Sequence, residues 1–118
     1  MPRYPTVTYG PSFGPATQWE NFVVVQALQA SLGLIHPEMT ALAVEAQPDA
    51  VVLHACIQGS TPELTEVFQD IIGDLKAALD PITDPVVPIT VRTYIGDSGP
   101  EWPGYPFRRL YMRYVGTD

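Results

Sequence analysis

The sequence has little cysteine and no recognisable catalytic or metal-binding motif. Its 118 residues include a single cysteine, Cys56, so no internal disulfide can form, and this favours a reducing compartment. No nucleophile motif, cluster of metal ligands or glycine-rich phosphate loop is recognisable. We therefore expect a protein without catalytic residues, metal or cofactor, that is, a protein that is not an enzyme.

Long apolar runs are missing as well. No uninterrupted apolar stretch approaches the roughly 20 residues of a membrane span, and the chain does not open with a basic segment followed by an apolar one. These absences predict a cytoplasmic protein that does not associate with membranes.

Positive charge is scarce in the middle of the chain. The formal net charge is −7, and residues 20–84 hold ten acidic residues against Lys76, whereas residues 85–118 hold four arginines against three acidic residues. Such a distribution repels phosphate backbones at long range and favours encounter with basic partners. The charge pattern therefore argues against general nucleic-acid binding and for a basic protein partner.

The length and composition predict one domain over residues 1–118. A hydrophobic content of 46% is enough for a core in a chain of this size. Prolines and glycines predict an irregular arm over residues 1–16. Helical spacing predicts a helix over 18–32, opened by a Thr17 capping box and ended at Gly33, and a second over 62–79, capped by Ser60 or Thr61.

Four segments have the composition of strands: 39–46, 50–57, 89–95 and 107–115. A short turn joins the first two into a predicted hairpin, and we expect the last two to form another around a proline-rich loop. The order is α-β-β-α-β-β. It predicts an α+β fold, a two-layer sandwich in which two helices cover one face of an antiparallel four-stranded sheet.

The second predicted helix carries four carboxylates at helical spacing, within roughly 80° of arc. We call them the acidic ridge: Glu63, Glu66, Asp70 and Asp74. The apolar residues of the same helix gather on another side, as in a helix with one buried face. A ridge of this kind complements the basic cleft of a nuclease, because carboxylates can stand in for phosphates and steer association. The alternative is an ordinary solvated helix face.

Two aromatic residues, Trp102 and Tyr105, lie in the loop before the last predicted strand. An exposed aromatic side chain is a common anchor at protein interfaces, so we predict that both residues bind the partner together with the acidic ridge. The alternative for Trp102 is that it folds back as a lid over the core, because a large apolar side chain gains free energy from burial.

His54 and Cys56 lie two residues apart on one predicted strand. A thiolate beside an imidazole can act as a nucleophile. Side chains two apart on a strand stand nearly parallel, however, and two ligands are fewer than zinc normally takes. The spacing therefore favours a partly buried structural pair.

Arginine and tyrosine alternate on the last two predicted strands. Arg109, Tyr111 and Arg113 share one side of the final strand, and Arg92 and Tyr94 share one side of the third, so we expect them on the sheet face away from the helices. That face is open to three interpretations: a solvated surface, a protein or nucleic-acid surface, or the site of a small enzyme or ligand-binding domain that holds an anionic ligand.

Several stretches resemble small bacterial immunity proteins of contact-dependent growth inhibition systems. The similarity covers roughly residues 24–115 and is carried by residues 27–29, 32–35, Pro37, 41–45, 57–59, 89–92 and 109–113. It implies a cytoplasmic antidote that occupies a toxin domain, often a nuclease, of the producing cell. The proline-rich first sixteen residues, the link from Pro81 to Pro88 and the Trp102 loop depart from the pattern. The identity of the toxin and the oligomeric state stay open, since an uncovered strand edge could also pair two copies.

Overall fold

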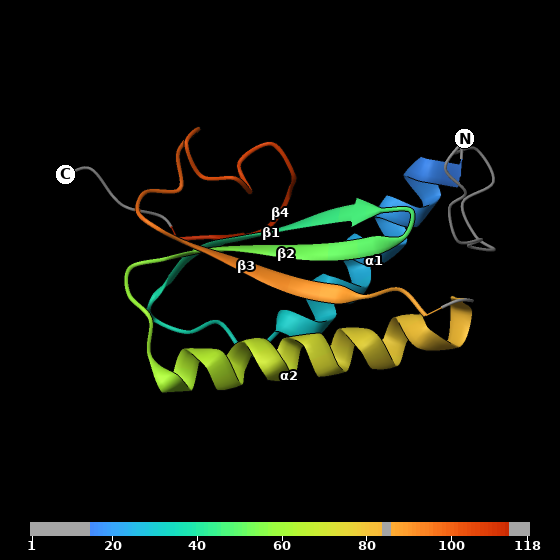
Figure 1. The fold of residues 1–118 in the computed structure, drawn as a ribbon, viewed down its shortest axis with the longest axis horizontal. Helices are drawn as coiled ribbons and strands as arrows, with labels where there is room; N and C mark the ends of the chain where they lie inside the picture. Colours follow the sequence, from blue (N-terminus) through green and yellow to red (C-terminus); the bar gives the residue numbers. More distant parts are fainter. Residues whose placement is uncertain (1–14, 84–85, 114–118) are drawn as a thin grey trace.

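The computed structural model describes residues 15–83 and 86–113. The elements are α1 (Pro15–Ser31), β1 (Met39–Gln47), β2 (Ala50–Ile57), α2 (Pro62–Leu79), the short 3-10 helix η1 (Asp80–Ile82), β3 (Ile89–Ile95) and β4 (Arg108–Met112) (Figure 1). This order confirms the α+β class and the predicted succession of elements. Helix α1 begins at Pro15, so the last two residues of the predicted arm are helical. The rest of that arm and residues 114–115 of the last predicted strand lie outside the described residues.

Helix α2 begins and ends where the sequence predicts. Thr61 is its N-cap, and the Thr61 hydroxyl accepts a hydrogen bond from the Leu64 backbone N–H at 3.1 Å. Pro62 follows in the first turn. Backbone N–H groups have no intrahelical partner there, so the N–H that proline lacks costs the helix no hydrogen bond. Asp80 closes the helix, and Pro81 lies just beyond it. The start of the acidic helix is therefore fixed by local chemistry.

Helix α1 starts earlier than its predicted cap. Thr17 lies inside the helix, so the predicted capping box is wrong. At the other end, Gly33 adopts φ +78°, a left-handed conformation that glycine tolerates and that commonly ends a helix. The buried Trp19 ties α1 to the sheet, because its Nε1–H donates a hydrogen bond to the Gln47 carbonyl at 2.8 Å.

The strand order in the sheet is β3-β2-β1-β4. The β1–β2 hairpin is confirmed, and β4 also pairs antiparallel with β1. The predicted antiparallel sheet is wrong at one pair, since β3 runs parallel to β2, and the predicted β3–β4 hairpin is wrong because these strands occupy opposite edges. Helix α2 is the reason: a connection of this length returns the chain to the starting end of the sheet, as parallel pairing requires.

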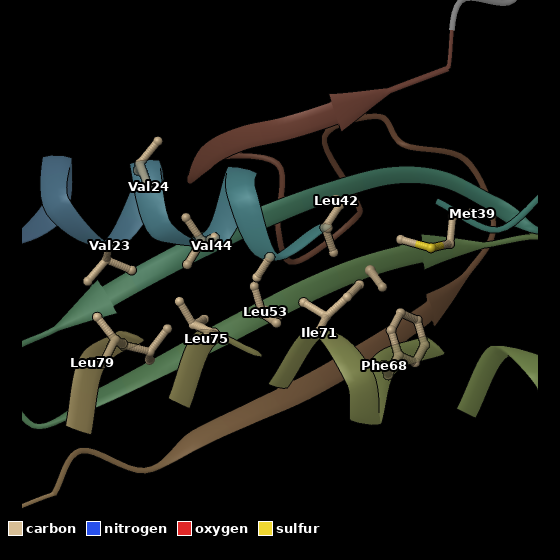
Figure 2. Close-up of a cluster of buried hydrophobic side chains, with 14 of the residues drawn as sticks. Val23, Val24, Met39, Leu42, Val44, Leu53, Phe68, Ile71, Leu75 and Leu79 are labelled. Atoms are coloured by element: carbon tan, nitrogen blue, oxygen red, sulfur yellow. The ribbon is translucent and has the colours of Figure 1, made fainter. Parts of the chain in front are cut away.

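The main core lies between the helices and one face of the sheet. Figure 2 shows Val23 of α1, Leu42 and Val44 of β1 and Ile71 and Leu75 of α2 in one cluster, and all five are buried. Both helices therefore cover the same face, which we call the helix face. The outer side of α2 is left to solvent.

The other side of the sheet, the loop face, carries a third layer. The loop of residues 96–107 runs from the β3 edge to the β4 edge, a distance of about 14 Å for three strand spacings (Figure 1). The small side chains of Ala41 and Ala43 leave room there for the indole of Trp102. The fold is thus a sheet covered by helices on one face and by a loop on the other.

Candidate functional site

The acidic ridge is exposed on α2. Glu63, Glu66, Asp70 and Asp74 are all exposed, whereas Leu64, Phe68, Ile71, Leu75 and Leu79 form the buried side of the helix. Within residues 15–83 and 86–113, no ion pair or side-chain hydrogen bond joins the ridge to another group. The ridge therefore presents four carboxylates to solvent on a helix that the core holds in place.

Three cations of the described chain are engaged away from the ridge. Arg108 pairs with Glu20 of α1 at 3.0 Å, and Lys76 of α2 pairs with Asp80, the C-cap of that helix, at 3.1 Å. Arg113 donates hydrogen bonds to the carbonyls of Pro37 and Met39. The structure thus gives the ridge none of these positive charges as a partner.

The two aromatic residues of the loop have different environments. The side chain of Trp102 is 1% exposed and packs on Ala41, Ala43 and Cys56, so its placement as an exposed anchor needs correction and the lid alternative is the one observed. Tyr105 is 42% exposed, and the Arg109 guanidinium carbon lies 4.6 Å above the centre of its ring. Tyr105 is therefore available to a partner, and Trp102 acts by fixing the loop.

The predicted arginine and tyrosine face is only partly formed. In β4, Arg109 pairs with Ala43 and Tyr111 pairs with Leu42, so Leu110 is an extra residue in a β-bulge. A bulge reverses the side to which following residues point. Tyr111 consequently packs against the helix-face core, and Arg109 stays on the loop face. The prediction that Arg109, Tyr111 and Arg113 share one face is wrong for this reason.

A polar cluster on the loop face has His54 at its centre. His54 is 2% exposed, its Nε2 lies 2.9 Å from Glu45 Oε1, and its ring stacks on Phe107 with centroids 5.1 Å apart. Gln47 donates a hydrogen bond to the other Glu45 oxygen at 2.5 Å. Burial by itself would raise the pKa of Glu45, but the hydrogen bonds from Gln47 and His54 and the charges of His54 and Arg92 lower it overall.

This cluster was missed at the sequence level although a signal for it exists. The hairpin pairs Ala43 with His54 and Glu45 with Val52, so Glu45 and His54 are diagonal neighbours on one face. Cys56, the other member of the predicted pair, is buried and donates from Sγ to the Gly96 carbonyl at 3.2 Å. His54 and Cys56 thus have separate partners, which agrees with a structural pair.

A hollow of about 810 Å³ opens on the loop face at the ends of the strands. It is lined by Thr40, Gln58, Ile95, Gly96, Asp97, Ser98, Gly99, Tyr105, Arg109 and Met112. Of the three arginines predicted to hold an anion, Arg109 is in this lining. Arg92 lies beside His54, with which it pairs across β2 and β3, and Arg113 donates hydrogen bonds to backbone carbonyls. The hollow therefore brings one guanidinium and one carboxylate, Asp97, to an open and partly apolar surface.

No protein-family model matches the chain, and no curated protein matches it. Among the described residues, no group of three or more histidine, cysteine, aspartate or glutamate side chains is arranged to hold a metal ion. The helices of the described chain are also too short or too polar to cross a membrane.

Proposed function

We propose that this chain is a cytoplasmic, non-catalytic immunity protein that binds and neutralises a cognate bacterial toxin domain, such as a nuclease. One observation supports this above the others: the acidic ridge is exposed on a well-anchored helix and has no cationic partner within the described residues. The resemblance to immunity proteins of contact-dependent growth inhibition supports the same function.

The ridge would act through charge and shape. A nuclease binds a polyanion in a basic cleft, and carboxylates on a rigid helix can occupy the positions of phosphates there. Exposed carboxylates also raise the rate of encounter with a positively charged protein. Tyr105 lies on the opposite, loop side of the sheet, where the buried Trp102 holds its loop in place, so Tyr105 is outside the ridge contact. The partner would thus be a basic protein surface, not nucleic acid or a membrane.

A growth assay tests this function. The proposal predicts that a neighbouring gene encodes a large secreted protein. Expression of the terminal domain of that protein in a bacterial host should arrest growth, and coexpression of this chain should restore growth. Reversal of two ridge charges, Glu66→Lys with Asp70→Lys, should remove protection. Asp97→Lys with Glu101→Lys, the same charge change on the loop side, should keep it.

Two results would contradict the proposal. Continued growth arrest in the presence of folded chain would show that the chain is not an antidote. Full protection by the ridge-reversed variant would show that the ridge does not contribute to neutralisation. Circular dichroism of both variants provides the control for folding.

A second candidate function is the binding of a small anionic ligand in the hollow on the loop face. The stacking of Arg109 on Tyr105 inside this hollow favours it, because a guanidinium beside an aromatic ring can hold an anion with an apolar body. Benzoate and inorganic phosphate are suitable probes. A rise in melting temperature that Arg109→Ala abolishes would support this candidate, and no rise would remove it.

A further inference from the structure

An apolar stripe covers the outer side of α1. Val25 and Leu28 of α1 and Leu32, one residue past its end, are 44%, 40% and 75% exposed, and helical spacing places the three within roughly 60° of arc. Single exposed apolar residues are ordinary, but three on successive turns form the pattern by which a helix contacts a partner. We call these three residues the α1 stripe. Sequence periodicity assigned the buried side of α1 and left the stripe without a role.

A shallow hollow between α1 and α2 adjoins both features, because its lining includes Gln29, one helical turn from Val25, and Asp74 of the ridge. It measures about 260 Å³ and is lined by Gln26, Gln29 and Ala30 of α1 and by Asp74 and Ala78 of α2. Asp74 is the last residue of the ridge, and Figure 1 shows the C-terminal half of α1 lying against α2. The stripe, the hollow and the ridge therefore border one surface, which we call the helix-layer surface.

The charges of this surface determine what it can bind. The ridge contributes four carboxylates, whereas α1 has one charged residue, Glu20, which is paired with Arg108. A complementary partner must be apolar where it meets the stripe and basic where it meets the ridge. Two copies of this chain are poorly matched, because a symmetric contact through this surface would gather the carboxylates of both ridges in one interface and like charges repel.

The dimensions favour a helix as the bound element. At 1.5 Å per residue, Glu63 and Asp74 are about 16 Å apart along α2, and the stripe from Val25 to Leu32, just past the end of α1, spans about 10 Å. These lengths correspond to two or three turns of a helix. A helix with basic residues on one side and apolar residues on the other is a common occupant of a groove between two helices.

We infer that the helix-layer surface binds a basic amphipathic helix of the partner, with the α1 stripe against its apolar side and the acidic ridge against its basic side. This inference rests on the proposed function and specifies which part of a toxin the chain recognises.

A peptide-binding experiment with the full chain tests this directly. The probe is a synthetic helical peptide of about five turns, with leucines along one side and lysines along the other, and the reference is a peptide of the same composition in scrambled order. Calorimetry should give an affinity at least about tenfold higher for the ordered peptide. Leu28→Ser with Leu32→Ser, and separately Glu66→Lys with Asp70→Lys, should each lower that affinity by about tenfold.

Matched variants separate this surface from general effects. Ile82→Ser with Val86→Ser removes two exposed apolar side chains elsewhere, and Asp97→Lys with Glu101→Lys makes the same charge change on the loop side; both should retain binding. Equal affinity for the scrambled peptide, or an unchanged affinity in the stripe variant, would overturn the inference. So would a dimer of the parent chain in light scattering that the stripe variant converts to a monomer, because a second copy would then cover the stripe.

The outcome also separates this inference from the proposed function, since the peptide assay contains no toxin. Ordered-peptide binding without growth protection would overturn the antidote function and leave the surface assignment. Growth protection by a stripe variant that no longer binds the peptide would overturn the surface assignment and leave the antidote function.

Discussion

The two faces of the sheet use their charged residues differently. On the loop face, Glu45 contacts His54 and Gln47, and Arg109 stacks on Tyr105, so these polar groups hold their own molecule together. On the helix face, the outer side of α2 displays four carboxylates that have no ion-pair partner in the described chain. The comparison indicates that the charge of Glu45 serves the fold, whereas the four ridge carboxylates of α2 are available for binding.

The largest effect on stability should come from the loop face, at Trp102. Trp102→Ala removes a fully buried indole and leaves a cavity over Ala41 and Ala43, so the free energy of unfolding should fall by about 3–5 kcal/mol. Urea denaturation measures this change. Trp102→Phe, which keeps part of the ring volume, should cost less. A loss below about 1 kcal/mol for the alanine variant would mean that the loop contributes little to the fold.

A smaller effect is expected at Gly104, a buried residue of the same loop. A Cβ atom at this position would come within 2.5 Å of His54 Cβ and of Trp102 Cζ2, so Gly104→Ala should destabilise the protein by about 1–3 kcal/mol through overpacking. Gly99→Ala is the control, because a Cβ at Gly99 meets no atom within 4 Å. Equal unfolding midpoints for the two variants would show that the loop does not pack tightly on His54.

The Glu45 carboxylate on the loop face should make the free energy of unfolding depend on pH. The folded protein lowers the pKa of Glu45, so its contribution to stability is present above the unfolded value of 4.5 and is lost as the pH falls through the folded pKa. Glu45→Gln should therefore flatten the decline of stability on acidification. Glu66→Gln, on the exposed ridge, is the control and should leave the dependence of the free energy of unfolding on pH unchanged. If the free energy of unfolding falls equally on acidification in the parent chain and in Glu45→Gln, the stabilising role of ionised Glu45 would be contradicted.

The smallest effect on stability should come from the ridge. Glu66→Lys with Asp70→Lys alters exposed side chains without partners in the described residues, so the free energy of unfolding should change by less than about 0.5 kcal/mol. Thermal or urea unfolding measures this change. A loss of more than about 2 kcal/mol would assign the ridge to the fold and would remove the contrast between the two faces.

Local patterns were sufficient to predict the elements, but not their arrangement. The Thr61 cap, Pro62 and the apolar spacing determine α2, and the short turn after Gln47 determines the β1–β2 hairpin. The pairing of β3 depends on where α2 returns the chain, which no residue of β3 encodes. The bulge at Leu110 likewise depends on the register with β1, so the alternation of residues 109–113 misassigned Tyr111.

The candidate site was predictable to a similar extent. Helical spacing alone identifies the acidic ridge, because exposure follows from which side of α2 is apolar. Burial of Trp102 required knowledge that Ala41 and Ala43 lie beneath the loop, which is a long-range contact. The α1 stripe was present in the sequence, but the helical spacing that assigns the buried side of α1 gives no role to apolar residues on its other side.

The most direct test of the difference between the two faces is the affinity of the purified chain for the toxin domain at low and high salt. If the ridge is the docking charge, reversal at Glu66 and Asp70 should weaken binding by at least about tenfold at low salt, and the loss should shrink as salt screens the charges. Reversal at Asp97 and Glu101 should leave the affinity within about twofold at both salt concentrations. Equal weakening by both charge reversals would contradict the account, because binding would then depend on net charge and not on the ridge.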